Sequence, residues 1–177
     1  SVSAKYTAFL PRVNLQYKIT PDVQVYAVYS QGNNPGGFQP ITPAQAAANN
    51  VPYAYDEEDI KNYEAGFKSR LFDGRLILNA AAFRMNFTKV QLSQTTPIAG
   101  TPTGFASIYL PGVEAKVTGF EFEADAALTT DFQVRGTVGY GKAEYVSFCS
   151  VPYAALTGIQ TGLNCRSVNG KQQEGTP

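Results

Sequence analysis

The chain has 177 residues, and its 14 basic and 14 acidic side chains give a net charge of zero. This balance excludes the basic excess that is typical of a nucleic-acid-binding domain. There is no His, so the commonest general base and metal ligand is missing, and we expect no catalytic and no metal site. The 11 Tyr, 11 Phe, 16 Gly and 11 Pro favour strands and turns over helices.

The first predicted element is a hairpin. Residues 4–20 read as a strand in which Val13, Leu15, Tyr17 and Ile19 alternate with polar residues. Pro11 within this run indicates an edge position or a bulge. A short turn at 20–22 leads into a partner strand over 23–30, whose apolar residues also recur with a period of two.

A long loop over residues 31–59 follows. It opens with QGNNPGGF, and we interpret Gly36-Gly37-Phe38 as a wide turn because the stretch lacks the spacing and the Lys of a phosphate-binding loop. The run PAQAAANN is compatible with one helical turn. The acidic residues 56–59 favour a solvated strand tip over a cation site, because they lack the ligand spacing of a calcium loop.

The central feature is a hairpin over residues 62–87 around the turn Phe72-Asp73-Gly74-Arg75. An Asp-Gly pair between two apolar-rich runs is a strong hairpin signal. The second run ends in Phe83, Met85 and Phe87, which we assign to the apolar side of the sheet together with Phe122 and Val134. This parity leaves Asn79 among apolar residues, so either it lies near the short-turn interface or a bulge shifts the register.

The remaining segments repeat the pattern. A second long loop over 93–108 precedes a strand over 113–128, a short turn at 129–131 and a strand over 132–148. The sequence therefore predicts an all-β, antiparallel up-and-down meander of about six strands. Its short turns fall at one end and its long loops at the other, which is typical of a transmembrane β-barrel. Six strands cannot close such a barrel, so we expect this chain to be a part of a longer polypeptide.

The segments PRVNLQYKITPDVQVYAVYSQGNNPGGF, YEAGFKSRLFDGRLILNAAAFRMNFTKVQL and GVEAKVTGFEFEADAALTTDFQVRGTVGYGKAEY resemble, in this order, the barrel of a TonB-dependent outer-membrane receptor. The resemblance covers most of residues 9–147. It implies a 22-stranded barrel plugged by an N-terminal domain. On this interpretation residues 1–177 are a partial barrel without the plug domain and the C-terminal strands, and residues 149–177 are an external loop.

The function that the resemblance implies is active transport across the outer membrane of a Gram-negative bacterium. Such a receptor binds a scarce nutrient, by default an iron–siderophore complex, and imports it with energy from TonB. Vitamin B12, haem and oligosaccharides stay open as ligands. We expect outer-membrane lipid, the plug domain of the same polypeptide, the TonB complex and a small molecule such as a metal chelate as partners, and neither a cofactor nor enzymatic activity.

The candidate site residues fall into three groups. Ligand-binding candidates in the external loops are Asn33, Asn34, Phe38, Tyr53, Tyr55 and Tyr109. Polar residues expected to face the barrel lumen or the plug are Glu64, Lys68, Arg70, Glu121, Glu123 and Arg135. Cys149 and Cys165 bracket one predicted external loop and are expected to form a disulfide, which would stabilise the fold by roughly 3 kcal/mol.

Aromatic residues near the long-loop ends of the strands are candidates for an interfacial girdle or for ligand contact, and the pattern leaves both roles open: Tyr26, Tyr29, Tyr53, Tyr55, Tyr109, Tyr140, Tyr145 and Phe148.

Two other classes of protein are alternatives. The first is a soluble extracellular β-sandwich that binds carbohydrate through exposed tyrosines. The second is an outer-membrane enzyme barrel, although a chain without His would need its general base elsewhere.

Overall fold

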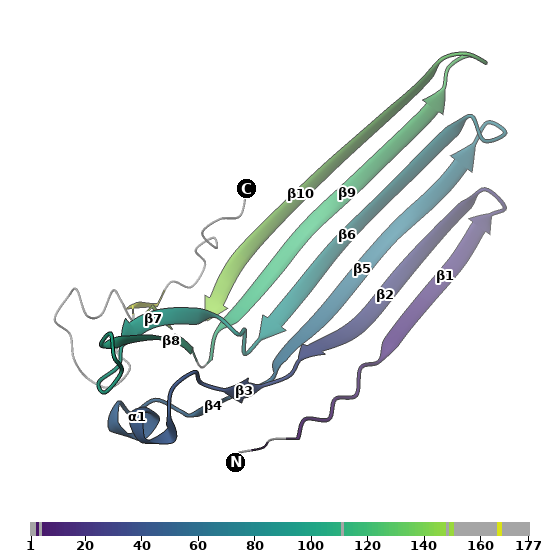
Figure 1. The fold of residues 1–177 in the computed structure, drawn as a ribbon. Coiled ribbons are helices and arrows are strands. Elements are labelled where there is room, and N and C mark those ends of the chain that lie inside the picture. Colours follow the sequence, from purple (N-terminus) through teal and green to yellow (C-terminus); the bar gives the residue numbers. More distant parts are fainter. Residues whose placement is uncertain (1–2, 4, 111, 148, 151–165, 168–177) are drawn as a thin grey trace.

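The computed structural model describes residues 3, 5–110, 112–147, 149–150 and 166–167. Its main feature is one antiparallel sheet in the order β1-β2-β5-β6-β9-β10, which confirms the predicted all-β up-and-down meander (Figure 1). The bounds of these strands are β1 Arg12–Thr20, β2 Val23–Asn34, β5 Glu58–Leu71, β6 Leu76–Thr88, β9 Glu114–Ala127 and β10 Gln133–Ser147. In the described part of the chain, no helix has the length and apolar character needed to cross a membrane.

The connections are sorted by length between the two ends of the sheet (Figure 1). The three short turns lie at one end, which we call the turn end. The other end, the loop end, carries two long connectors. The connector between β2 and β5 contains β3 Gly37–Phe38, α1 Pro43–Ala48 and β4 Ala54–Tyr55, and the connector between β6 and β9 contains β7 Ser93–Pro97 and β8 Phe105–Tyr109. Beyond β10, β11 Cys149–Ser150 pairs with β12 Arg166–Ser167.

The central turn is closed by three consecutive residues with left-handed backbone. Phe72, Asp73 and Gly74 have φ values of 55°, 55° and 86°, and Leu71 pairs with Leu76 across the turn. Gly and Asp tolerate this region more readily than other residues, whereas a left-handed Phe is uncommon. The Asp-Gly pair therefore does position the hairpin, as the sequence predicts.

Two boundaries differ from the sequence-based expectation. The first strand begins at Arg12 and not at residue 4, because Pro11 cannot donate to the ladder; the Pro11 carbonyl instead accepts from the backbone N–H of Gln31 at 3.0 Å. The segment 93–108, expected to be a loop, holds the β7–β8 hairpin. That hairpin forms because Ile98 and Ile108 are buried, and their burial offsets the entropy of ordering the connector.

The two faces of the six-stranded sheet differ in chemistry. One, the apolar face, carries large hydrophobic side chains that are largely exposed, such as Leu15 at 68% and Val138 at 59%. Cross-strand pairing places these residues on the apolar face: Val13, Leu15, Tyr17, Ile19, Val25, Tyr63, Phe67, Phe120, Phe122, Val134, Val138 and Tyr140. Among the described residues no second sheet covers this face, which is the arrangement of a sheet that faces lipid.

The predicted parity of the strand after the central turn is wrong. Phe83 pairs with Glu64 and Gly119 and therefore lies on the opposite, polar face, whereas Phe122 pairs with Ala80 on the apolar face. The pairing of β6 with both neighbours runs without a bulge. Asn79 consequently lies on the polar face, and the conflict noted in the sequence disappears.

The described chain has its most buried apolar cluster outside the sheet, between the two long connectors. Ile41 and Ala46 of the first connector pack with Ile98 and Ile108 of the second, and all four are less than 9% exposed. Helix α1 is held by a complete capping box between Thr42 and Gln45, which explains why so short an alanine run is helical. The loop end is thus a packed unit built from both connectors.

Candidate ligand-binding mouth and luminal face

Four of the predicted ligand-binding aromatics form two pairs at the loop end. The rings of Phe38 and Tyr53 stack with centroids 5.3 Å apart, and those of Tyr55 and Tyr109 lie 4.2 Å apart. The second pair joins the first connector to the second. The structure therefore brings together Tyr55 and Tyr109, which are 54 positions apart in the sequence, although it does not bring all six candidates to one point.

Gly36 and Gly37 are required by the close approach of Tyr55. Gly37 pairs with Tyr55 in the short β3–β4 ladder. A Cβ on Gly37 would lie 2.5 Å from the Tyr55 hydroxyl oxygen, and a Cβ on Gly36 would collide with the Tyr55 carbonyl. The two glycines thus make room for Tyr55, and the stretch interpreted as a wide turn from the sequence contains the short strand β3, which pairs with β4.

Two side-chain amides fasten the connectors to each other. Gln39, which is 4% exposed, donates to the Tyr109 carbonyl at 2.9 Å and accepts from the Tyr109 N–H at 2.8 Å. Asn49 makes the same kind of paired contact with Ala99, donating at 3.2 Å and accepting at 2.8 Å. Each amide satisfies a backbone donor and acceptor at once, so the connectors are held in a fixed relation.

The remaining asparagine candidates serve the same junction. Asn34 donates to Gln91 Oε1 at 3.0 Å, while Gln91 Nε2 donates to the Pro35 carbonyl at 2.7 Å. Asn33 donates to Glu57 at 3.1 Å. Asn33 and Asn34 are therefore engaged within the protein and not directed into a common ligand site.

The acidic run 56–59 is divided among separate partners. Asp56 forms an ion pair with Lys89 at 3.5 Å, and Glu58 accepts from the Gln91 backbone N–H at 3.2 Å. The described residues contain no group of three or more His, Cys, Asp or Glu that could hold a metal ion. This distribution favours the interpretation of the run as a solvated strand tip.

A cavity of about 180 Å³ lies between the connectors beside the Tyr55–Tyr109 pair. Its polar lining comes from Gln39, Asp56, Lys89 and Gln91 as well as the two tyrosines. Burial, reinforced by Tyr109, raises the pKa of the Tyr55 phenol, so this hydroxyl stays protonated at neutral pH and can donate a hydrogen bond. The cavity could accept a flat or ring-shaped group with a hydrogen-bond acceptor.

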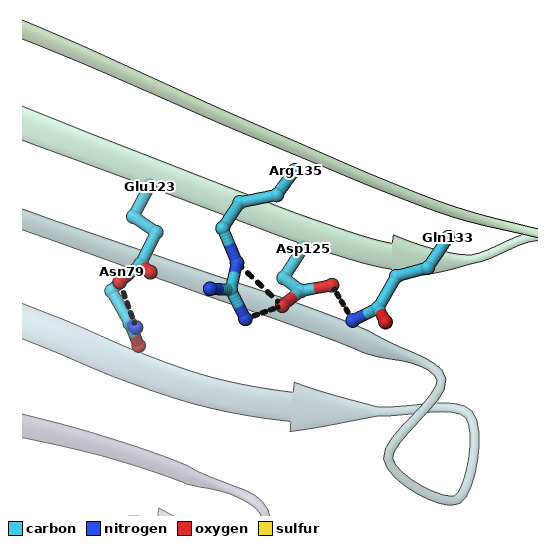
Figure 2. Close-up of polar contacts among 5 residues, drawn as sticks. All are labelled: Asn79, Glu123, Asp125, Gln133 and Arg135. Carbon is cyan, nitrogen blue, oxygen red and sulfur yellow. Dashed lines mark hydrogen bonds and ion pairs between the residues drawn. The ribbon is translucent and has the colours of Figure 1, made fainter.

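The polar face carries a charge pair near the turn end, shown in Figure 2. Asp125 on β9 is 6% exposed and accepts two hydrogen bonds from Arg135 on β10, from Nε at 2.9 Å and from a terminal nitrogen at 2.6 Å. Gln133 donates to the other carboxylate oxygen at 2.5 Å. On the neighbouring pair of strands Asn79 donates to Glu123 at 3.0 Å.

Further along the polar face, Tyr26 lies at the centre of a second group. Its hydroxyl donates to Glu64 at 2.8 Å, and the Lys68 ammonium lies 5.6 Å from the centre of its ring. Pairing places Glu121 in the same row of residues as Tyr26 and Gly66. Arg70 packs against the central turn at Gly74.

All six residues predicted to face the lumen or plug share this polar face: Glu64, Lys68, Arg70, Glu121, Glu123 and Arg135. Sequence reasoning missed the central place of Tyr26, which it grouped with interfacial aromatics, and the Asn79 contact. The alternation of side chains, combined with the pairing of β2 and β5, would have found Tyr26. Glu64 pairs with Val28, and Tyr26 lies two residues from Val28 and therefore on the same face.

Of the predicted interfacial aromatics, Tyr29 and Tyr140 lie on the apolar face of the sheet, whereas Tyr26 lies on the polar face. Tyr29 and Tyr63 pack with ring centroids 5.2 Å apart, and Phe120 and Tyr140 with centroids 5.9 Å apart, on the apolar face toward the loop end. The disulfide between Cys149 and Cys165 stays a prediction, since Cys165, like Phe148 and most of residues 149–177, lies outside the described residues.

Comparison with known proteins identifies the family. The family described as TonB dependent receptor-like, beta-barrel matches residues 1–172. The metal-pseudopaline receptor CntO of Pseudomonas aeruginosa is 29% identical over 137 residues, which is 77% of this chain and 17% of the receptor. This chain therefore spans about a sixth of the length of that curated relative.

Solved structures show the same fold. The ferripyoverdine receptor of the Pseudomonas aeruginosa outer membrane aligns with a TM-score of 0.57 and 22% identity, covering 80% of this chain and 18% of the receptor. The ferric-catecholate import receptor Fiu of E. coli aligns with a TM-score of 0.54 and 21% identity, covering 79% of this chain and 19% of the receptor. The unclosed six-stranded sheet, its uncovered apolar face and the family match agree, and the chain therefore belongs to the β-barrel family of TonB-dependent receptors, which are receptors of the Gram-negative outer membrane and not enzymes.

Proposed function

We propose that this chain forms part of the wall and external mouth of a receptor that binds a metal chelate of the siderophore type and imports it with energy from TonB. The relatives are described as receptors for metal-pseudopaline, ferripyoverdine and ferric catecholates, which supports a metal chelate as the ligand class. The plug domain and the TonB contact would lie in parts of the polypeptide outside this chain.

The observation that carries the proposal is the Tyr55–Tyr109 pair beside the loop-end cavity. Paired phenols offer ring faces for a planar chelate group and hydroxyls for its polar edge. Lys89, which is half exposed and pairs with Asp56 at 3.5 Å, offers the cavity an ammonium donor for a polar group of the chelate. The amide clamps of Gln39 and Asn49 hold this surface in place, which lowers the entropy lost on binding.

The test is binding and uptake by the intact receptor. Replacing both Tyr55 and Tyr109 by Ala should weaken the binding of its metal chelate by about 10- to 100-fold, measured by calorimetry with a panel of iron, nickel and zinc chelates. A matched Tyr17→Ala variant, which changes an exposed tyrosine of the apolar face, should bind normally. Equal binding by all three proteins, or import that continues in cells lacking TonB, would contradict the proposal.

The soluble β-sandwich alternative is not supported, since the described part of the chain places no second sheet on the apolar face.

A further inference from the structure

Lysine and arginine are distributed unevenly on the apolar face. On β5, β6, β9 and β10, but not on β1 and β2, a cation is the first or second apolar-face residue beyond the aromatic or alanine rows toward the loop end. Lys61 is the next residue on this face after Tyr63, and Lys142 is the next after Tyr140. Arg84 follows Ala82, and Lys116 lies two positions on this face beyond Phe120. At about 6.6 Å for every two residues, all four lie just beyond the apolar band.

These four residues, the outer cationic cluster, occupy two adjacent rows of the sheet. Arg84 pairs with Tyr63 and with Thr118, which in turn pairs with Lys142, so these residues share one row. The pairs Lys61–Asn86, Asn86–Lys116 and Lys116–Glu144 form the next row. These two rows thus contain four cations and one carboxylate, that of Glu144.

Glu144 does not neutralise the cluster. Its carboxylate forms ion pairs with Lys116 at 3.3 Å and with Lys142 at 2.8 Å, and it holds these two side chains side by side. In the part of the chain that the structure describes, Lys61 and Arg84 make no ion pair, and both are exposed. The next carboxylates on this face, Asp59 and Glu114, lie further toward the loops.

The turn end of the apolar face has a different composition. Within the described strands it carries Ile19, Leu71, Leu76, Ala126 and Val134 at the corresponding positions and neither Lys nor Arg. The cations of the strands near that end, Lys18, Lys68 and Arg70, are on the polar face. Within the described strands, the cations of the apolar face are therefore confined to its loop end.

We propose that the outer cationic cluster binds phosphate groups of lipid headgroups in the external leaflet of the outer membrane. Lysines and arginines at headgroup level attract anionic lipids, and Arg binds phosphate oxygens through two parallel donors. The aromatic pairs Tyr29–Tyr63 and Phe120–Tyr140 mark the headgroup level on the same strands. The partner is a phosphorylated lipid with its chains along the apolar face, and not a soluble anion.

The experiment measures the binding of diphosphoryl lipid A and of enzymatically dephosphorylated lipid A to the intact receptor in neutral detergent. We expect wild-type receptor to bind the diphosphoryl form at least tenfold more tightly, and Lys61→Gln/Arg84→Gln to lower that affinity about 10- to 30-fold. Raising NaCl from 0.1 M to 0.5 M should have a similar effect.

The matched control is Arg12→Gln/Lys18→Gln, which removes two cations from the polar face of β1. Arg12 pairs with Ser30, and Ser30 pairs with Asn62, which lies between Lys61 and Tyr63 on β5. Arg12 is therefore at the same distance from the loop end as the cluster, but on the opposite face of the sheet. This variant should bind lipid normally. Equal affinity of the wild-type receptor for the two lipids overturns the proposal even if a variant fails to fold. Equal losses in the two variants, or displacement of the lipid by 10 mM inorganic phosphate beyond the effect of equimolar sulfate, would overturn it as well.

Discussion

At the residue scale, the polar face is organised by carboxylates whose partners lie on the next strand. Asp125 is almost fully buried, yet it receives three hydrogen bonds from Arg135 and Gln133 (Figure 2). A buried carboxylate without donors would be costly, so this group depends on its two neighbours. The arrangement cross-links β9 and β10 at their turn end.

We expect Arg135→Leu to lower the midpoint of urea unfolding of the refolded barrel, because within the described residues it leaves the buried Asp125 with Gln133 as its one remaining hydrogen-bond donor. Arg12→Leu, which removes a cation from the same face without an ion pair in the described residues, is the control and should change the midpoint little. The double variant Asp125→Leu/Arg135→Leu should be more stable than Arg135→Leu alone. A single variant as stable as the double one would show that the pair does not matter.

At the scale of elements, the two long connectors act as one packed unit and not as independent loops. Their shared apolar cluster and the paired amides of Gln39 and Asn49 are contacts between segments that are about 50 to 70 residues apart. Such contacts cannot be derived from the spacing of residues in the sequence. This is why the sequence located the two long connectors and allowed for the helical turn, but missed the β3–β4 and β7–β8 pairings and the clamp between the connectors.

Replacing Gln39 by Leu should loosen this unit. The change leaves the Tyr109 N–H and carbonyl without their partners, which costs about 1–3 kcal/mol, so amide exchange over residues 105–109 should accelerate about tenfold or more. Hydrogen exchange with mass spectrometry on the intact receptor measures this effect. Gln24→Leu, on the polar face of β2, is the matched control; unchanged exchange in Gln39→Leu would mean that the apolar cluster alone fixes the connectors.

Strand β6 is the element whose side chains were assigned to the wrong faces from the sequence. Phe83, Met85 and Phe87 are apolar and large, so a period-two count that seeks hydrophobic residues takes them for the apolar side. The pairing places them on the polar face, where the Phe83 ring packs over Gly119. The small residues Ala80 and Ala82 occupy the apolar face instead, and their small size conceals the correct parity.

Single cysteines along β6 test this register. In an intact receptor without the native cysteines, Asn79→Cys and Ala81→Cys should react with a charged, water-soluble thiol reagent, whereas Leu78→Cys and Ala80→Cys should react with a lipid-soluble one. The reactivity should therefore alternate with every residue. The reverse alternation would restore the assignment made from the sequence, and a break in the alternation would reveal a bulge.

At the scale of the whole molecule, the six-stranded sheet separates two environments. The period-two pattern predicted the meander, the sorting of turns and loops, and the polar side of every strand of the sheet except β6, because these depend on alternation and chain order alone. The asymmetry between the ends of the apolar face could also be read from the sequence, but only after the register of every strand is known. The fold is therefore encoded locally, whereas the mouth and the cationic cluster depend on pairing between strands.

The last prediction tests which face meets lipid. Val138 and Thr137 are neighbours on β10, and the pairing places Val138 on the apolar face opposite Phe122 and Thr137 on the polar face opposite Glu123. Arg near the bilayer midplane of a transmembrane β-barrel costs about 2–4 kcal/mol, whereas Arg in a water-filled interior costs little. Val138→Arg should therefore lower the free energy of unfolding in lipid vesicles by about this amount, and Thr137→Arg should leave it nearly unchanged or improve it through Glu123. Because the two variants add the same side chain one residue apart on one strand, their propensities and their effects on the unfolded state are matched. Equal destabilisation by both would mean that both faces meet the same environment, and the membrane-spanning assignment of the sheet would have to be abandoned.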